Sequence, residues 1–268
     1  MRTAPEQDLA RRPPDRGRAH GDTRPRAALG RPSRPPYLGS GASIPTLLLV
    51  ACGTLGGVAF TAVYLAEGAF RSGYDAVSQP ISALSLGPGG SLQQGNFALF
   101  GVLMILSAFG WRRLLAGTRG GLAFPVTRAV VGVGLVVDGI FSQDAGHGYP
   151  PGVTTAASSL QGELHNAAAV VVILGLAAGC FVLARRFSPD PLWRDWAPFA
   201  FATGILTLVF ITAFGLYGGS GGVAGVLERL AGAVNSVFGL AVLLRLLLQA
   251  RHERQAAAWN DLGGRHSL

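Results

Sequence analysis

The feature that most limits how this chain can fold is a set of six apolar runs, each about as long as a lipid bilayer is thick. An α-helix rises 1.5 Å per residue, so roughly 20 helical residues cross a hydrocarbon core of about 30 Å. The runs of this length are residues 44–66, 97–115, 124–141, 165–184, 198–216 and 227–248. They predict an all-α, polytopic membrane protein built as a bundle of six transmembrane helices.

The composition supports this class and excludes several others. Only 13% of the 268 residues are charged, and the mean hydropathy is +0.39. Soluble domains usually carry about 25% charged residues. The chain therefore has too few polar side chains for a soluble enzyme, a DNA-binding domain or a secreted disulfide scaffold. All 22 basic residues are arginines and 39 residues are glycines, a bias that indicates a GC-rich bacterial genome.

The net charge of +8 does not point to a nucleic acid partner, because nine of the arginines lie in the proline-rich segment before residue 43. A segment this polar cannot bury enough apolar surface to fold. We therefore expect residues 1–43 to be a disordered tail, residues 44–250 to be the six-span domain and residues 251–268 to be a C-terminal tail. An upstream start codon that adds residues without a function would equally explain the first segment.

The arginines also predict the orientation in the membrane. They gather before the first run, in the connections that follow the second and fourth runs, and after the sixth run, whereas the other connections contain only Arg71. Connections rich in arginine stay in the cytoplasm. We therefore expect a multi-pass protein of the bacterial plasma membrane with both termini cytoplasmic.

The polar residues suited to binding or chemistry lie on the opposite, outer side. The outer connections are long, and long ordered loops in compact proteins are often functional. The candidate ligand-binding residues are Asp75, Gln94, Asn96, Asp138, Asp144, His147, Tyr149, Glu163 and His165. Asp138 falls in the last turn of the third run and His165 in the first turn of the fourth, so both lie near the outer boundary of adjacent antiparallel helices, where the two side chains could meet.

Several separated motifs occur in the order found in one known family. These motifs are Ile81 to Gly87, Gln94 to Phe97 with Gly101, Gly139 to Asp144, Gly148 to Gly152, Gly162 to His165, and Cys180 to Phe187. Over residues 46–248 the chain resembles the bacterial six-span proteins catalogued as domain of unknown function 998. Two positions depart from the family pattern, since Ala145 stands where proline is frequent and Ser91 where an aromatic residue is common. The resemblance implies the six-span architecture and important outer loops, and it implies no cofactor.

Three interpretations of the outer polar residues remain open. A metal or acid–base site, with zinc as the metal, would use Asp138, Asp144, His147, Glu163 and His165, although no His-x-x-x-His or Glu-x-x-His pair is present. In a milder version, Asp144 and His165 hydrogen-bond each other and either bind a polar headgroup or act as a proton-sensitive gate. Alternatively, these residues cap helices and tie loops to the bundle, with Asp138 paired to Arg229.

The favoured function is non-catalytic binding or handling of a lipid or small amphiphile at the outer leaflet, which makes membrane lipids the expected partners. One alternative is a membrane-embedded hydrolase or transferase that uses the outer aspartate and histidine residues. Another is a structural or regulatory subunit of a membrane complex. Ionisable residues in or beside membrane spans are costly and tend to be functional, although helix capping and loop tethering would explain the same residues.

Overall fold

The structure is a computed structural model that describes residues 37–118, 121–146, 148–153, 158–217 and 222–265. Its long helices are α1 (Ile44–Phe70), α2 (Gly90–Leu114), α3 (Ala123–Ile140), α4 (Leu160–Phe187), α5 (Ala197–Tyr217) and α6 (Ala224–Arg265). Two short 3₁₀ helices are η1 (Ile81–Ser85) and η2 (Arg194–Trp196). All six long helices are long and apolar enough to cross a membrane. The predicted all-α fold with six spans is confirmed.

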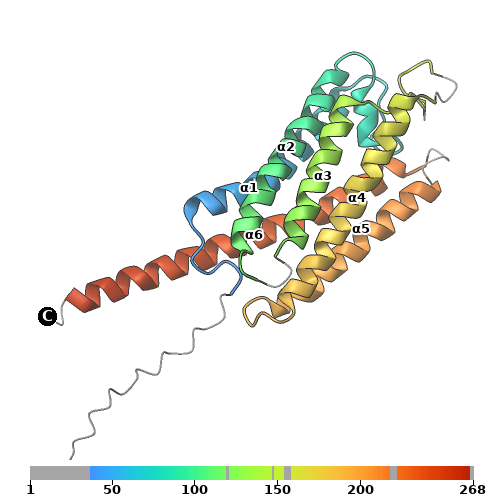
Figure 1. Cartoon of the computed structure of the whole chain (residues 1–268). Helices are drawn as coiled ribbons and strands as arrows, with labels where there is room; N and C mark the ends of the chain where they lie inside the picture. Colours follow the sequence, from blue (N-terminus) through green and yellow to red (C-terminus); the bar gives the residue numbers. More distant parts are fainter. Residues whose placement is uncertain (1–36, 119–120, 147, 154–157, 218–221, 266–268) are drawn as a thin grey trace, which may run out of the picture. The chain divides into compact units, whose positions relative to one another are not determined.

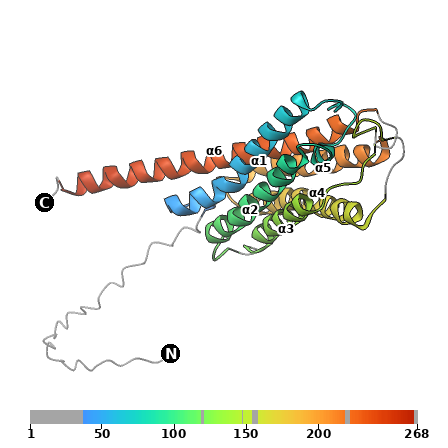
Figure 2. The same cartoon turned by 90° about the horizontal axis from the view of Figure 1, so that it is seen from above.

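The six helices form a closed ring (Figures 1 and 2). Each helix packs antiparallel against the next in the chain, and α6 packs against α1. We call the end that carries the connections after α1, α3 and α5 the loop end. We call the opposite end, which carries the connections after α2 and α4, the arginine end, because Arg112, Arg113, Arg185 and Arg186 lie there.

The outside of the ring is apolar on all six helices. Large exposed apolar side chains include Leu55, Leu99, Val133, Val170, Val209 and Leu244. In a soluble protein such a surface would be an aggregation hazard, whereas in a bilayer it contacts lipid chains. The bundle therefore has the surface expected of a protein surrounded by lipid.

Helices α2 and α3 approach each other closely because glycines face each other at their contact. A Cβ atom on Gly101 would lie 2.6 Å from the carbonyl oxygen of Gly132, and one on Gly132 would lie 2.7 Å from that of Gly101. Small residues allow this close backbone approach, which is a main source of helix association in membranes. The contact holds α3, and the polar residues that it carries, against the rest of the ring.

The folded part extends beyond the predicted limits of the six-span domain at both ends. Leu38 is buried, its N–H donates to Asp190 Oδ2 (3.0 Å) and its carbonyl oxygen accepts from Trp193 Nε1 (3.2 Å). Residues 37–43 are thus packed at the arginine end, while residues 1–36 of the predicted tail lie outside the described residues.

At the other terminus α6 continues to Arg265, about 63 Å from its start, and projects past the other helices (Figure 1). Three arginines and three alanines lie among residues 251–265, and both residue types favour helix.

Candidate functional site

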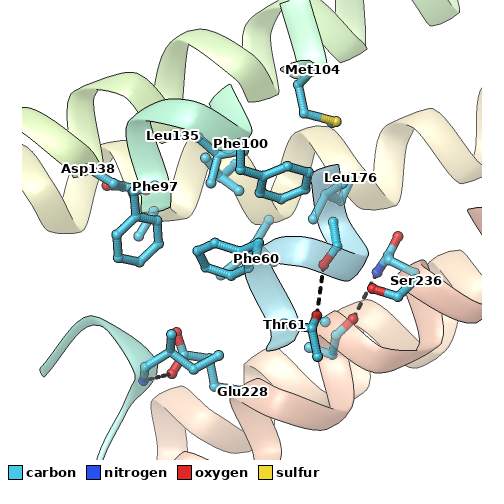
Figure 3. A pocket seen from close by; sticks show the side chains of 18 of the residues that line it. Phe60, Thr61, Phe97, Phe100, Met104, Leu135, Asp138, Leu176, Glu228 and Ser236 are labelled. Carbon is cyan, nitrogen blue, oxygen red and sulfur yellow. Dashed lines mark hydrogen bonds between the residues drawn. The ribbon is translucent and has the colours of Figure 1, made fainter. Parts of the chain in front are cut away.

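The ring encloses a cavity of about 160 Å³, to which all six long helices and η1 contribute. Its walls are mainly apolar and aromatic, and Figure 3 shows Phe60, Phe97 and Phe100 clustered there beside Leu135 and Leu176. A water molecule needs roughly 10–15 Å³ of such space, so the cavity has room for several waters or part of a small ligand. Cavities with apolar walls and a few polar groups are the usual form of small-molecule sites.

Asp138 and His165 form the first polar group of the cavity. Asp138 Oδ1 lies 3.6 Å from His165 Nδ1, and both side chains are at most 3% exposed. Nδ1 also lies 2.8 Å from the carbonyl oxygen of Phe141. Because a carbonyl can only accept, Nδ1 carries the hydrogen and donates it. The expected meeting of Asp138 with His165 across adjacent helices is confirmed.

Glu228 is the second polar group, and it holds the first loop (residues 71–89, between α1 and α2) against the bundle. Its Oε2 accepts a hydrogen bond of 2.6 Å from the N–H of Ile81, 147 residues earlier in the chain. Ile81 and Ser82 of η1 line the cavity, and all five η1 residues are buried. In Figure 3 the rings of Phe97 and Phe60 lie between Asp138 and Glu228. The η1 segment therefore covers the cavity at the loop end.

Arg128 of α3 is the third polar group, and it was not among the residues predicted from the sequence. It lines the cavity, and its Nε is buried without a hydrogen-bond partner. Among the described residues no carboxylate lies within 4.0 Å of its guanidinium, and its closest aromatic partner is Phe124, with the ring centroid 5.7 Å from Cζ. The signal that could have identified it is an arginine five residues inside an apolar run.

Eight of the nine predicted ligand-binding residues lie in the described part of the chain, and of these eight only Asp138 and His165 line this cavity. Asp75 accepts hydrogen bonds from the hydroxyl of Ser78 (2.5 Å) and the N–H of Val77 (3.0 Å), which lower the pKa of its carboxyl and shape an exposed turn. Asn96 Nδ2 donates to the carbonyl oxygen of Phe60 on α1 (3.1 Å) and to the Oε1 atom of Gln93 (3.1 Å).

Three more of the predicted residues also lie away from the cavity. Tyr149 is buried with its ring against that of Tyr74 at 5.6 Å between centroids, Gln94 is half-buried on α2, and Glu163 is exposed on α4. His147 lies outside the described residues. Among those that are described, there is no group of three or more His, Cys, Asp or Glu side chains placed to hold a metal ion. The five residues of the zinc hypothesis are thus not gathered in one place by the part of the chain that the structure describes.

The predicted hydrogen bond between Asp144 and His165 is wrong. Asp144 accepts instead from the N–H (2.9 Å) and the hydroxyl (2.6 Å) of Ser159, whose Oγ in turn accepts from the N–H of Gly162. Ser159 is the N-cap of α4, so the aspartate orients a helix cap. His165 lies more than one turn further along α4, where its side chain lines the cavity and donates to the carbonyl oxygen of Phe141, the residue that follows α3.

The predicted pair between Asp138 and Arg229 is also wrong. Arg229 donates to the carbonyl oxygens of Gln79 (3.1 Å) and Gly225 (2.8 Å) and to the hydroxyl of Tyr74 (2.5 Å). Burial raises the pKa of Tyr74 to about 12, so its hydroxyl stays protonated and also donates to the carbonyl oxygen of Pro80 (3.0 Å). Arg229 therefore anchors the connection between α1 and α2 on α6. Its donors are directed at this connection and not at Asp138 of α3.

The comparisons with known proteins identify one family. The curated proteins and the solved structures contain no match to this chain. The family model described as protein of unknown function (DUF998) matches residues 54–245, which include the whole of α2 to α5 and every residue that lines the cavity except Gly53. The match covers more than half of the chain, and the chain therefore belongs to the DUF998 family.

Proposed function

We propose that this protein binds a small amphiphile inside the six-helix ring. The observation that carries the proposal is the cavity, which combines aromatic and aliphatic walls with Asp138, His165, Glu228 and Arg128 as its charged or ionisable groups. An apolar chain would contact the walls, and a polar headgroup would find hydrogen-bond partners. The site lies within the bundle, so the outer-leaflet location expected from the loops is replaced by one between the helices.

The amphiphile would reach the cavity from the membrane through the contact between α1 and α6. Gly232 of α6 lines the cavity, is itself exposed, and has nothing within 4 Å of the position that a Cβ atom would take. Gly57 and Thr61 of α1 line the same side, together with Ser236. The two helices cross at an angle (Figure 2). Because η1 covers the loop end, this lateral opening is the route that the packing favours.

Binding is tested by blocking the lateral opening. We expect purified protein in a nonionic detergent to bind ¹⁴C-labelled decanoate, and the variant Gly232→Trp to bind it at least five-fold less, because an indole would occupy the open space at this position. The matched control is Gly95→Trp, since Gly95 is an exposed glycine on α2 that also has nothing within 4 Å and does not line the cavity. Absence of binding to the wild type, or equal binding by both variants, would contradict the proposal.

A membrane-embedded hydrolase or transferase is the second candidate, and the Asp138–His165 contact is the observation that favours it. A buried carboxylate beside an imidazole is an arrangement used for general acid–base catalysis. Repeating the binding experiment with a labelled decanoate ester separates the two functions, because an enzyme would cleave the bound ester or transfer its acyl group, whereas a binder would release it unchanged.

We propose further that the arginine end faces the cytoplasm of a bacterium, which places both termini inside. Single cysteines at the exposed positions Ser72 and Ser158 of the loop end should react with an impermeant thiol reagent in intact cells. Cysteines at the exposed positions Ala116 and Ser188 of the arginine end should react only after the cells are opened. The variants would lack the two native cysteines. Reaction at Ala116 in sealed cells would reverse the orientation.

A further inference from the structure

We propose that Arg128 is an anion-binding group and that the amphiphile carries an oxyanion, a carboxylate or a phosphate, which pairs with its guanidinium inside the bundle. This inference rests on the proposed function and adds the chemical class of the ligand. Neither the sequence motifs nor the family match assigns a role to this arginine.

The position of Arg128 is the first argument. It lies on α3 five residues after the helix begins, about 8 Å along its axis. It lines the main cavity and also a smaller cavity of about 60 Å³ that extends toward the arginine end between residues such as Trp111, Cys180 and Leu183. Arg128 is therefore at the junction of two internal spaces, where a ligand in either one would meet its side chain.

The lack of a protein partner is the second argument. A guanidinium remains charged at every physiological pH and offers five N–H donors. Among the described residues Arg128 has no hydrogen bond and no ion pair, although the other buried or half-buried arginines, Arg71, Arg186, Arg229 and Arg245, each have at least one. Charged side chains within membrane spans normally pair with another group. No described residue supplies that group for Arg128, and a bound anion would supply it.

The residues around the Arg128 guanidinium leave space for it and do not use its hydrogen-bond donors. A Cβ atom on Gly53 of α1 would lie 2.3 Å from Arg128 Nη2, so only a glycine leaves room for the guanidinium at this point. The side-chain amide of Asn235, which lines both cavities, donates to Thr207 Oγ1 (2.7 Å) and to the carbonyl oxygen of Ala231 (2.9 Å), and its Oδ1 lies 3.6 Å from Cys180 Sγ. Asn235 is thus held within the protein, and Arg128 keeps its donors for a ligand.

The distribution of charge in the cavity favours an anion at this place. The acidic side chains that line the cavity are Asp138 and Glu228, and Asp138 follows Arg128 by ten residues, about 15 Å along α3. The two carboxyl groups lie toward the loop end and the arginine toward the other end. A guanidinium binds carboxylate and phosphate oxygens through two parallel N–H···O bonds. An anionic headgroup would therefore be attracted to Arg128 and kept away from the acidic groups.

The experiment compares three probes of equal chain length, which are decanoate, decyl phosphate and decanol, in equilibrium binding to purified protein in a nonionic detergent. We expect the wild type to prefer one or both anions over decanol by at least ten-fold. Arg128→Gln should lose this preference, with anion binding reduced at least ten-fold and decanol binding changed less than two-fold. The comparison of decanoate with decyl phosphate then distinguishes the carboxylate from the phosphate as the bound group.

Two further variants keep the test decisive. Gly53→Ala retains the arginine but should displace its guanidinium, and it should also lower the preference for the anions. Arg113→Gln removes an exposed arginine of α2 and should leave the preference unchanged, which controls for the general positive charge. If Arg128→Gln does not fold, the wild-type preference together with Gly53→Ala decides the question.

Two results would overturn the inference in different ways. Equal binding of decanol and both anions to the wild type, or an unchanged preference in Arg128→Gln, would remove the anion site and leave amphiphile binding intact. If none of the three probes binds, the proposed function fails. Binding of ³²P-phosphate that Arg128→Gln abolishes would then still support an anion site, and its absence would remove that site as well.

Discussion

Replacing Gly101 by alanine is expected to destabilise the bundle by about 3 kcal/mol, at the upper end of the cost of overpacking a well-packed interior. The added Cβ atom would meet the carbonyl oxygen of Gly132 at 2.6 Å and the N–H nitrogen of Val136 at 2.8 Å. These are backbone atoms, so neither can rotate away, and α2 and α3 would have to separate. We expect a large loss of folded protein in size-exclusion chromatography and a clearly lower melting temperature in detergent.

The matched control is Gly95→Ala in the same helix. Gly95 is exposed and has nothing within 4 Å of the Cβ position, and alanine favours helix over glycine by up to about 1 kcal/mol. We expect this variant to melt at or slightly above the wild-type temperature. A Gly101→Ala protein that melts like Gly95→Ala would show that the two helices do not approach as closely as described.

Replacing Arg229 by alanine is expected to release the first loop from α6 and to cost about 3 kcal/mol. The change removes the hydrogen bonds to Gln79, Gly225 and Tyr74, and hydrogen bonds to a charged group contribute roughly 1.5–3 kcal/mol each before the neighbours relax. It also removes the contacts of the guanidinium with the rings of Tyr64 and Tyr74, whose centroids lie 5.6 and 5.8 Å from Cζ.

Arg229→Ala should also loosen the first loop locally, in addition to lowering the stability of the whole protein. Hydrogen exchange of residues 71–89 should increase more than that of the helices, because this loop would lose the hydrogen bonds and the ring contact of Arg229 and keep fewer anchors on α6, such as Glu228 with Ile81. Arg229→Lys should recover a minor part of the stability, since an ammonium group cannot reproduce the planar fork of donors. Arg113→Ala, an exposed arginine at the opposite end of the bundle, serves as the control and should be nearly neutral. Unchanged exchange in residues 71–89 of Arg229→Ala would contradict the anchoring role.

Much of the local structure could be predicted from the sequence. The starts and ends of the six apolar runs agree with the helices to within a few residues, except at the C-terminal end of α6 and at the N-terminal ends of α2 and α4, where polar turns extend the helices beyond the apolar stretch. The contact between Asp138 and His165 was also predictable, because adjacent antiparallel helices joined by one connection bring their facing ends together. The helix limits and the Asp138–His165 contact both depend on residues within one helix or within two consecutive helices.

The partners of the remaining polar residues could not be predicted in the same way. Asp144 could cap α4 or reach His165, and sequence position does not distinguish these choices. Arg229 could meet Asp138 or the first loop, and the answer depends on how residues 71–89 cross the end of the bundle. That path is held by contacts such as Glu228 with Ile81 and Arg229 with Tyr74, which join segments about 150 residues apart.

The length and apolarity of the six runs are enough to predict six membrane-length helices, because the cost of leaving backbone groups unpaired in lipid allows almost no other structure for such runs. Which polar side chains share the interior depends instead on how the helices pack. Arg128 lies within one of those runs, and whether it faces lipid or the cavity depends on the rotation of α3, which its glycine contact with α2 sets. The closure of α6 onto α1 then turns separate helix faces into one enclosed space that places Arg128, Asp138 and Glu228 around a common cavity.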